Sequence, residues 1–152
     1  MKSLEEFLAY AVRLEREAAA RFDELADAIA GQGSSEVTAF FRQMAVYSRR
    51  HLQDAQARSG YRDVPVIDGA DFDWPDGESP EAAAIWASDG FSSLEDAMAV
   101  ALDAEQRGHA FYASVVASAT DPELRAVAAE FAEEEADHVA QLERLMARLK
   151  AA

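Results

Sequence analysis

Hydrophobic side chains recur along most of the chain with a period of 3.6 residues, which predicts amphipathic α-helices. Four such stretches are present, at about residues 4–30, 35–59, 93–118 and 122–149. Between residues 60 and 92 this period is lost and proline, glycine and aspartate accumulate, a composition typical of a connection. We therefore predict an all-α chain of four long helices, with a short helix over 81–88 as an additional candidate.

Residues typical of helix starts stand at the borders of these stretches. Ser3 and Ser92 each precede a glutamate by three residues, the spacing of a capping box. Ser34 or Ser35 opens the second helix, and Asp121 followed by a proline opens the fourth.

The lengths of the links favour one arrangement of the helices. Short links join the first helix to the second and the third to the fourth, so each pair is expected to form an antiparallel hairpin. The link at about 60–92 has roughly 30 residues, which is long enough to run the length of a bundle. The whole chain, 1–152, is therefore expected to be one domain, a four-helix bundle of two hairpins joined by a long crossover.

The two predicted hairpins repeat one another in sequence. A shift of 90 residues places Glu15 on Glu105, and a shift of 87 residues places His51 on His138. Each hairpin therefore carries a glutamate on its first helix and a histidine on its second. Such a chain can fold as a pseudo-twofold pair.

Composition limits the chemistry available to this chain. Its 14 basic and 29 acidic residues give a formal net charge of −15, which argues against nucleic acid or an anionic membrane as partner and favours cations. The sequence has no cysteine, which excludes disulfides, thiol nucleophiles and cysteine-ligated metals. A bound metal would have to be held by carboxylates and imidazoles. Neither a membrane helix nor a signal peptide is evident, so we expect a cytoplasmic protein.

Several ionisable residues fall on the apolar stripes of the predicted helices, namely Glu15, Glu105, Glu135 and His138. A carboxylate buried alone is strongly destabilising, so several at one level need a shared cation or protons. In di-iron carboxylate bundles, two helices each supply a glutamate and the other two each supply a Glu-x-x-His motif. Of the acidic run at 133–135, we expect only Glu135 to point inward.

The segments around these residues resemble the rubrerythrin branch of the ferritin-like superfamily. The similar segments are Leu14-Glu15 with Phe22, the sequence EQRGHAFY from Glu105 to Tyr112, and EEEADH from Glu133 to His138. The resemblance extends over nearly the whole chain except residues 61–90. It implies a ferritin-like four-helix bundle.

The resemblance also implies a ligand set for two iron ions, with zinc or manganese as alternative metals. Glu15 and Glu105 would each be a terminal ligand of one iron, Glu135 would bridge the two, and His51 and His138 would each bind one. Tyr112 is expected to be a core aromatic residue or, alternatively, a redox-active or hydrogen-bonding phenol beside the metals.

One position departs from the family pattern, because the second Glu-x-x-His reads Ser48-Arg-Arg-His51. A serine hydroxyl is a poor ligand for a hard divalent metal and brings no charge to offset it. The gap predicts one weak metal position, a water in place of the bridge, or a substitute ligand. His109, four residues after Glu105, is the first candidate substitute, with a hydrogen-bonded neighbour of the ligands as its alternative role. Asp54 and Tyr47 are weaker candidates.

The activity that the resemblance implies is peroxide reduction to water, or oxidation of Fe(II) by O₂. Rubrerythrins usually carry a second, cysteine-ligated iron domain that supplies electrons. Because this chain has no cysteine, the implied electron source is a separate donor protein. We expect a homodimer. The alternative is a non-catalytic metal-binding or stress-related bundle with a weakened metal site.

Overall fold

The computed structural model describes residues 1–32, 34–80 and 93–151. Within these ranges there are four long α-helices and a short 3-10 helix, and no strand. The long helices are α1 (Leu4–Ile29), α2 (Ser35–Ser59), α4 (Leu94–Ser118) and α5 (Pro122–Ala151), and the 3-10 helix is η1 (Gly69–Asp71). The predicted all-α class and long helices are confirmed, whereas the candidate helix at 81–88 lies outside the described residues.

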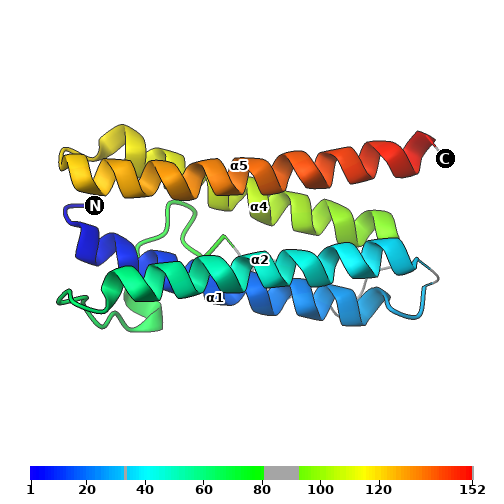
Figure 1. Ribbon diagram of the computed structural model, residues 1–152, viewed down its shortest axis with the longest axis horizontal. Coiled ribbons are helices and arrows are strands. Elements are labelled where there is room, and N and C mark those ends of the chain that lie inside the picture. The colour runs from blue at the N-terminus through cyan, green and yellow to red at the C-terminus, as the bar shows by residue number, and fades with distance from the viewer. Residues whose placement is uncertain (33, 81–92, 152) are drawn as a thin grey trace.

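The helices pair as two hairpins that lie alongside each other (Figure 1). Helix α1 packs mainly on α2, and α4 packs mainly on α5, with smaller contacts from α1 to α4 and to α5. The four axes run roughly along the long dimension of the molecule, as expected for a bundle. No helix in the described part of the chain is long and apolar enough to cross a membrane.

The helix starts follow the capping signals with one correction. The Ser3 and Ser34 hydroxyl oxygens accept hydrogen bonds from backbone N–H groups in the first turns of α1 and α2. At α4, however, the capping residue is Ser93, whose Oγ accepts from the backbone N–H of Asp96 at 3.1 Å, while the predicted Ser92 lies outside the described residues. Ser93 has the extended backbone that aims its hydroxyl at the free N–H groups of the first turn. The predicted capping box was therefore wrong by one residue.

Two apolar clusters fill the bundle, one toward each end. The first cluster joins the start of α1 to the end of α4 and the start of α5, and includes Phe7, Tyr112 and Phe131. The second joins the end of α1 to the starts of α2 and α4 and the end of α5, and includes Phe41 and Leu142. The middle turns of the helices lie between these clusters, and this layer holds the buried charged residues.

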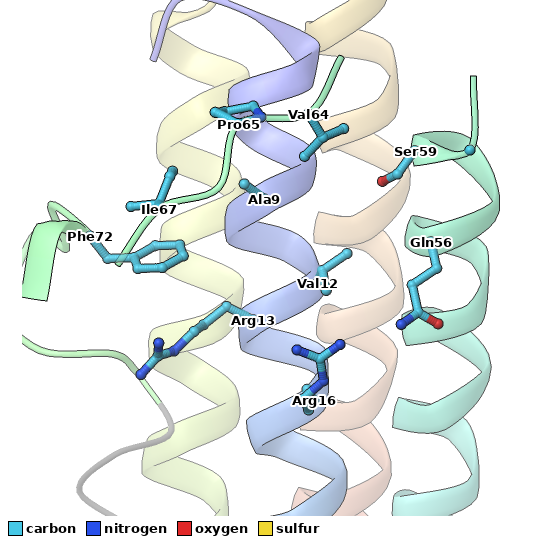
Figure 2. Close-up of a pocket in the computed structure, with 11 residues that line it drawn as sticks. Ala9, Val12, Arg13, Arg16, Gln56, Ser59, Val64, Pro65, Ile67 and Phe72 are labelled. Carbon is cyan, nitrogen blue, oxygen red and sulfur yellow. The ribbon is translucent and has the colours of Figure 1, made fainter. Parts of the chain in front are cut away.

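The connection after α2 packs against α1. The Tyr10 ring contacts the rings of Phe72 and Trp74, and the Tyr10 hydroxyl oxygen accepts a hydrogen bond from the Asp73 backbone N–H at 2.8 Å. A pocket of about 410 Å³ lies between this connection, α1 and α2. Its lining combines apolar side chains with the polar side chains of Arg13, Arg16, Gln56 and Ser59 (Figure 2). None of the predicted metal ligands lines this pocket, so the candidate site is elsewhere.

Candidate metal centre

A layer of buried polar side chains crosses the middle of the bundle. The carboxylates of Glu15 on α1, Glu105 on α4 and Glu135 on α5 are at most 1% exposed, and His138 on α5 is 4% exposed. His51 on α2 is half-buried. All five residues fall on the inward stripes that the helical period predicts, so the sequence identified the right faces of the four helices.

On one side of this layer, Glu15 faces His51 and Tyr112. The Tyr112 hydroxyl donates a hydrogen bond to Glu15 Oε1 at 2.9 Å. Glu15 Oε2 lies 3.7 Å from His51 Nδ1, too far for a hydrogen bond. Both of these atoms are buried and have no hydrogen-bond partner in the described chain. Because such atoms are costly to leave unsatisfied, the two are suited to share a cation or a proton.

On the other side, Glu105 is held by two partners. Arg21 donates from Nη2 to Glu105 Oε1 at 2.5 Å, and His138 Nδ1 lies 3.2 Å from Glu105 Oε2. The Arg21 guanidinium also lies 4.0 Å from the centre of the Phe22 ring. Arg21 is fully buried, so this pair is an ion pair deep in the bundle.

Glu135 lies between the two sides. Its Oε2 is 3.9 Å from His138 Nδ1. Glu135, His51 and His138 each have one potential ligand atom within 4.8 Å of those of the other two residues. Across from Glu135 is Gly108, where an added Cβ would come within 3.6 Å of Glu135 Oε2. This is an ordinary van der Waals distance, so the α4 backbone at Gly108 packs directly against the Glu135 carboxylate.

The electrostatic environment keeps Glu105 ionised. Burial raises the pKa of Glu105, but the hydrogen bond with His138, the charge of Arg21 and a hydrogen bond with Glu135 outweigh it and lower the pKa to about 2. For His51, burial lowers the pKa, while the negative charges of Glu15, Glu134 and Glu105 raise it, and the net shift is upward. The buried carboxylates thus favour positive charge within this layer.

Two residues at this layer were not predicted from the sequence. Arg21 was missed because a basic residue is normally assigned to a wet face, although it lies seven residues after the buried Leu14 and so shares its side of α1. Glu134 was expected to be solvated, but its Oε2 lies 3.2 Å from His51 Nε2 while 42% of its side chain stays exposed. The expectation that Glu134 is fully solvated is therefore corrected, because α2 brings His51 next to Glu134 on α5.

The candidates for filling the gap at Ser48 differ in position. Ser48 is buried, which places the gap inside the layer. Tyr47 stacks on His138 with ring centres 5.9 Å apart, and Asp54 pairs with Arg58. His109 is half-buried and, among the residues that the structure describes, is not part of the group of close ligand atoms formed by His51, Glu135 and His138. Its ligand role stays a prediction.

The layer opens to solvent between α2 and α5. A shallow pocket of about 150 Å³ there is lined by Tyr47, His51, Glu134, Asp137, His138 and Gln141. Its two acidic residues give the opening a negative charge, which favours entry of cations. The two histidines are therefore reached from the surface without passing through either apolar cluster.

Comparison with known proteins agrees with this geometry. Residues 6–63 match the family model described as Rubrerythrin. The chain is also similar to the crystal structure of an uncharacterized conserved protein from Magnetospirillum magnetotacticum MS-1, with 33% identity, a TM-score of 0.79, and 96% and 95% of the two chains covered. The chain belongs to the rubrerythrin-like branch of the ferritin-like superfamily. A comparison with curated proteins gave no match.

The donor set of this rubrerythrin-like chain suits a divalent metal. Carboxylate oxygens and imidazole nitrogens are common ligands of iron, manganese and zinc in proteins. The buried Glu15 Oε2 and His51 Nδ1 atoms lack partners in the part of the chain that the structure describes, and a shared cation would satisfy both. The residues present thus form a possible metal-ligand group.

Proposed function

We propose that this chain is a rubrerythrin-like iron protein that reduces hydrogen peroxide or oxidises Fe(II), with electrons for peroxide supplied by a separate donor protein. The observation that supports this most strongly is a pair of buried potential ligand atoms, Glu15 Oε2 and His51 Nδ1, that have no hydrogen-bond partner in the described chain. They face each other at the layer that also holds Glu135 and His138. The proposal requires iron at this cluster and is independent of the number of ions bound.

Glu15, His51, Glu135 and His138 would hold the metal, with Glu105 beside His138. His51 suits this role because its Nε2 faces the Glu134 carboxylate at 3.2 Å, which favours a proton on Nε2 and leaves the Nδ1 lone pair for the metal. Iron bound there would supply one-electron chemistry at a position open to small oxidants. Zinc would bind the same donors but would not support redox turnover.

Peroxide reduction consumes two electrons and two protons for each H₂O₂ and releases two waters. Tyr112 holds a proton at its hydroxyl and donates it in a hydrogen bond to Glu15 Oε1, so this proton lies directly beside one of the proposed metal ligands. The ring of Tyr112 is buried among Phe7, Phe111 and Phe131. This apolar setting keeps bulk water from that side of the site.

The test uses the full chain loaded anaerobically with Fe(II). We expect one equivalent of H₂O₂ to oxidise two equivalents of bound iron at a rate well above that of free Fe(II), followed by absorbance and stopped flow. The Tyr112→Phe variant, which keeps the ring but loses the hydroxyl, should bind iron normally and react more slowly. Failure of the wild type to bind Fe(II), or equal rates for bound and free iron, would contradict the proposal.

A non-catalytic metal-binding bundle is the second candidate, favoured by the loss of a carboxylate at the buried Ser48. In that case the protein would bind the metal, but peroxide would oxidise it no faster than the free ion. The same stopped-flow comparison therefore distinguishes the two functions.

A further inference from the structure

We propose that the Arg21 guanidinium takes the place of a second metal ion, so that each chain binds one divalent cation, on the Glu15–His51 side of the layer. This inference rests on the proposed metal centre and specifies how many ions it accepts and what excludes the second. It is carried by the charges of the buried groups and by which donor atoms already have partners.

The buried charges balance with one divalent ion. Glu15, Glu105 and Glu135 contribute three negative charges and Arg21 contributes one positive charge, and none of these side chains is more than 1% exposed. With all three carboxyl groups ionised and both imidazoles neutral, which are the forms that bind a metal, the net charge of this buried set is therefore −2. A di-iron bundle with four glutamates carries −4 and is neutral with two divalent ions. Because uncompensated charge is costly to bury, the set in this chain is neutral with one ion.

The other acidic groups near the layer do not change this count. Glu134 and Asp137 line the opening between α2 and α5, where water screens their charges. Asp54 forms an ion pair with Arg58. Ser48 adds no charge where the second bridging carboxylate would stand, and Gly108 has no side chain.

The pattern of hydrogen bonds distinguishes the two sides. On the Glu15–His51 side, Glu15 Oε2 and His51 Nδ1 have no hydrogen-bond partner in the described chain. On the Glu105–His138 side, both Glu105 oxygens are engaged, one by Arg21 and the other by His138. A cation bound on the first side would be coordinated by Glu15 Oε2 and His51 Nδ1 without breaking a hydrogen bond. On the second side it would have to approach the guanidinium and displace an existing hydrogen bond.

Arg21 cannot leave the layer easily. Its side chain is fully buried and its guanidinium packs on the Phe22 ring at 4.0 Å, a stacked cation–π contact. Arginine also stays charged at any pH at which the protein folds. The positive charge beside Glu105 is therefore a fixed part of the site, unlike a metal ion that can exchange.

The experiment is an anaerobic titration of the metal-free full chain with Co(II), followed by gel filtration and elemental analysis. We expect one Co(II) per wild-type chain. The Arg21→Gln/Ser48→Glu double variant removes the positive charge and restores the missing carboxylate, so it should bind two. Arg21→Lys keeps the charge and should bind one. Arg42→Gln, at an exposed arginine paired with Asp23 and Asp27, is the matched control and should also bind one.

Each outcome has a definite meaning. Two ions per wild-type chain would overturn this inference while leaving the proposed metal centre intact, whereas no bound ion would overturn the metal centre itself. One ion in both the wild type and a folded double variant would show that Arg21 does not set the number. Should the double variant not fold, the electron paramagnetic resonance of the Co(II)-loaded wild type decides, because an isolated high-spin ion supports the inference and a coupled pair contradicts it.

Discussion

At the scale of single residues, Glu135 is the carboxylate that faces both histidines. Its buried Oε2 lies 3.9 Å from His138 Nδ1, and its ligand atom belongs to the same group as that of His51. The Glu135→Ala variant should bind Fe(II) more than about 100-fold more weakly, beyond the 10–100-fold loss typical of removing a hydrogen-bond partner of a ligand. Anaerobic titration with elemental analysis measures this.

The neighbouring Glu133 is the matched control for that substitution, because it is exposed on the same helix. Glu133→Ala removes the same charge and should leave iron binding within about twofold of wild type, since exposed charges are screened. Equal losses in the two variants would mean that long-range charge, and not ligation by Glu135, controls binding.

Candidate ligands at fixed helical positions could be predicted because burial follows the period of the sequence. Glu15 and Glu105 occupy positions of an apolar stripe, and each is buried as expected. Arg21 occupies such a position too, but its role depends on Glu105, which is 84 residues away in sequence. No local pattern identifies a partner at that distance.

At the scale of helices, the role of Ser93 as the N-terminal cap of α4 can be tested by substitution. Ser93→Ala removes the hydroxyl that accepts from the Asp96 N–H, and this should lower the free energy of unfolding by about 1 kcal/mol. Urea denaturation of the metal-free protein measures the difference. Ser118→Ala, at an exposed serine in the last turn of the same helix, should change it by less than about 0.5 kcal/mol. Equal effects would argue against Ser93 as the cap.

At the scale of the whole molecule, the polar layer separates two apolar clusters that stabilise the bundle from its ends. A metal that binds the folded layer and not the unfolded chain stabilises the protein by mass action, by about 2.7 kcal/mol at 100 times the dissociation constant. For a chain of this size we expect the melting temperature to rise by roughly 5–11 °C. Calorimetry with and without anaerobic Fe(II) measures this.

The Glu135→Ala variant is the control for this stabilisation as well. Its melting temperature should hardly respond to Fe(II), because the donor set is incomplete. A rise of the same size in both proteins would place the stabilising ion elsewhere, for example at the acidic surface.

The positions of the helices, their pairing into hairpins and the inward faces of the candidate ligands could all be predicted from the order of residues. These features follow from short-range physics: a 3.6-residue period, side chains that satisfy the first N–H groups of a helix, and links whose length restricts where the next helix can lie. Even here the period alone did not separate Ser92 from Ser93, because a cap depends on the backbone angles of one residue.

Which buried groups face one another depends on how the helices pack, and no pattern along the chain predicts it. The pairing of Arg21 with Glu105, and of His51 with Glu134, joins residues on different helices whose relative rotation is set by packing of the two apolar clusters. A rotation of one helix by a fraction of a turn would exchange these partners without changing any pattern in the sequence. The balance of charge in the layer is therefore a property of the folded bundle and not of its separate helices.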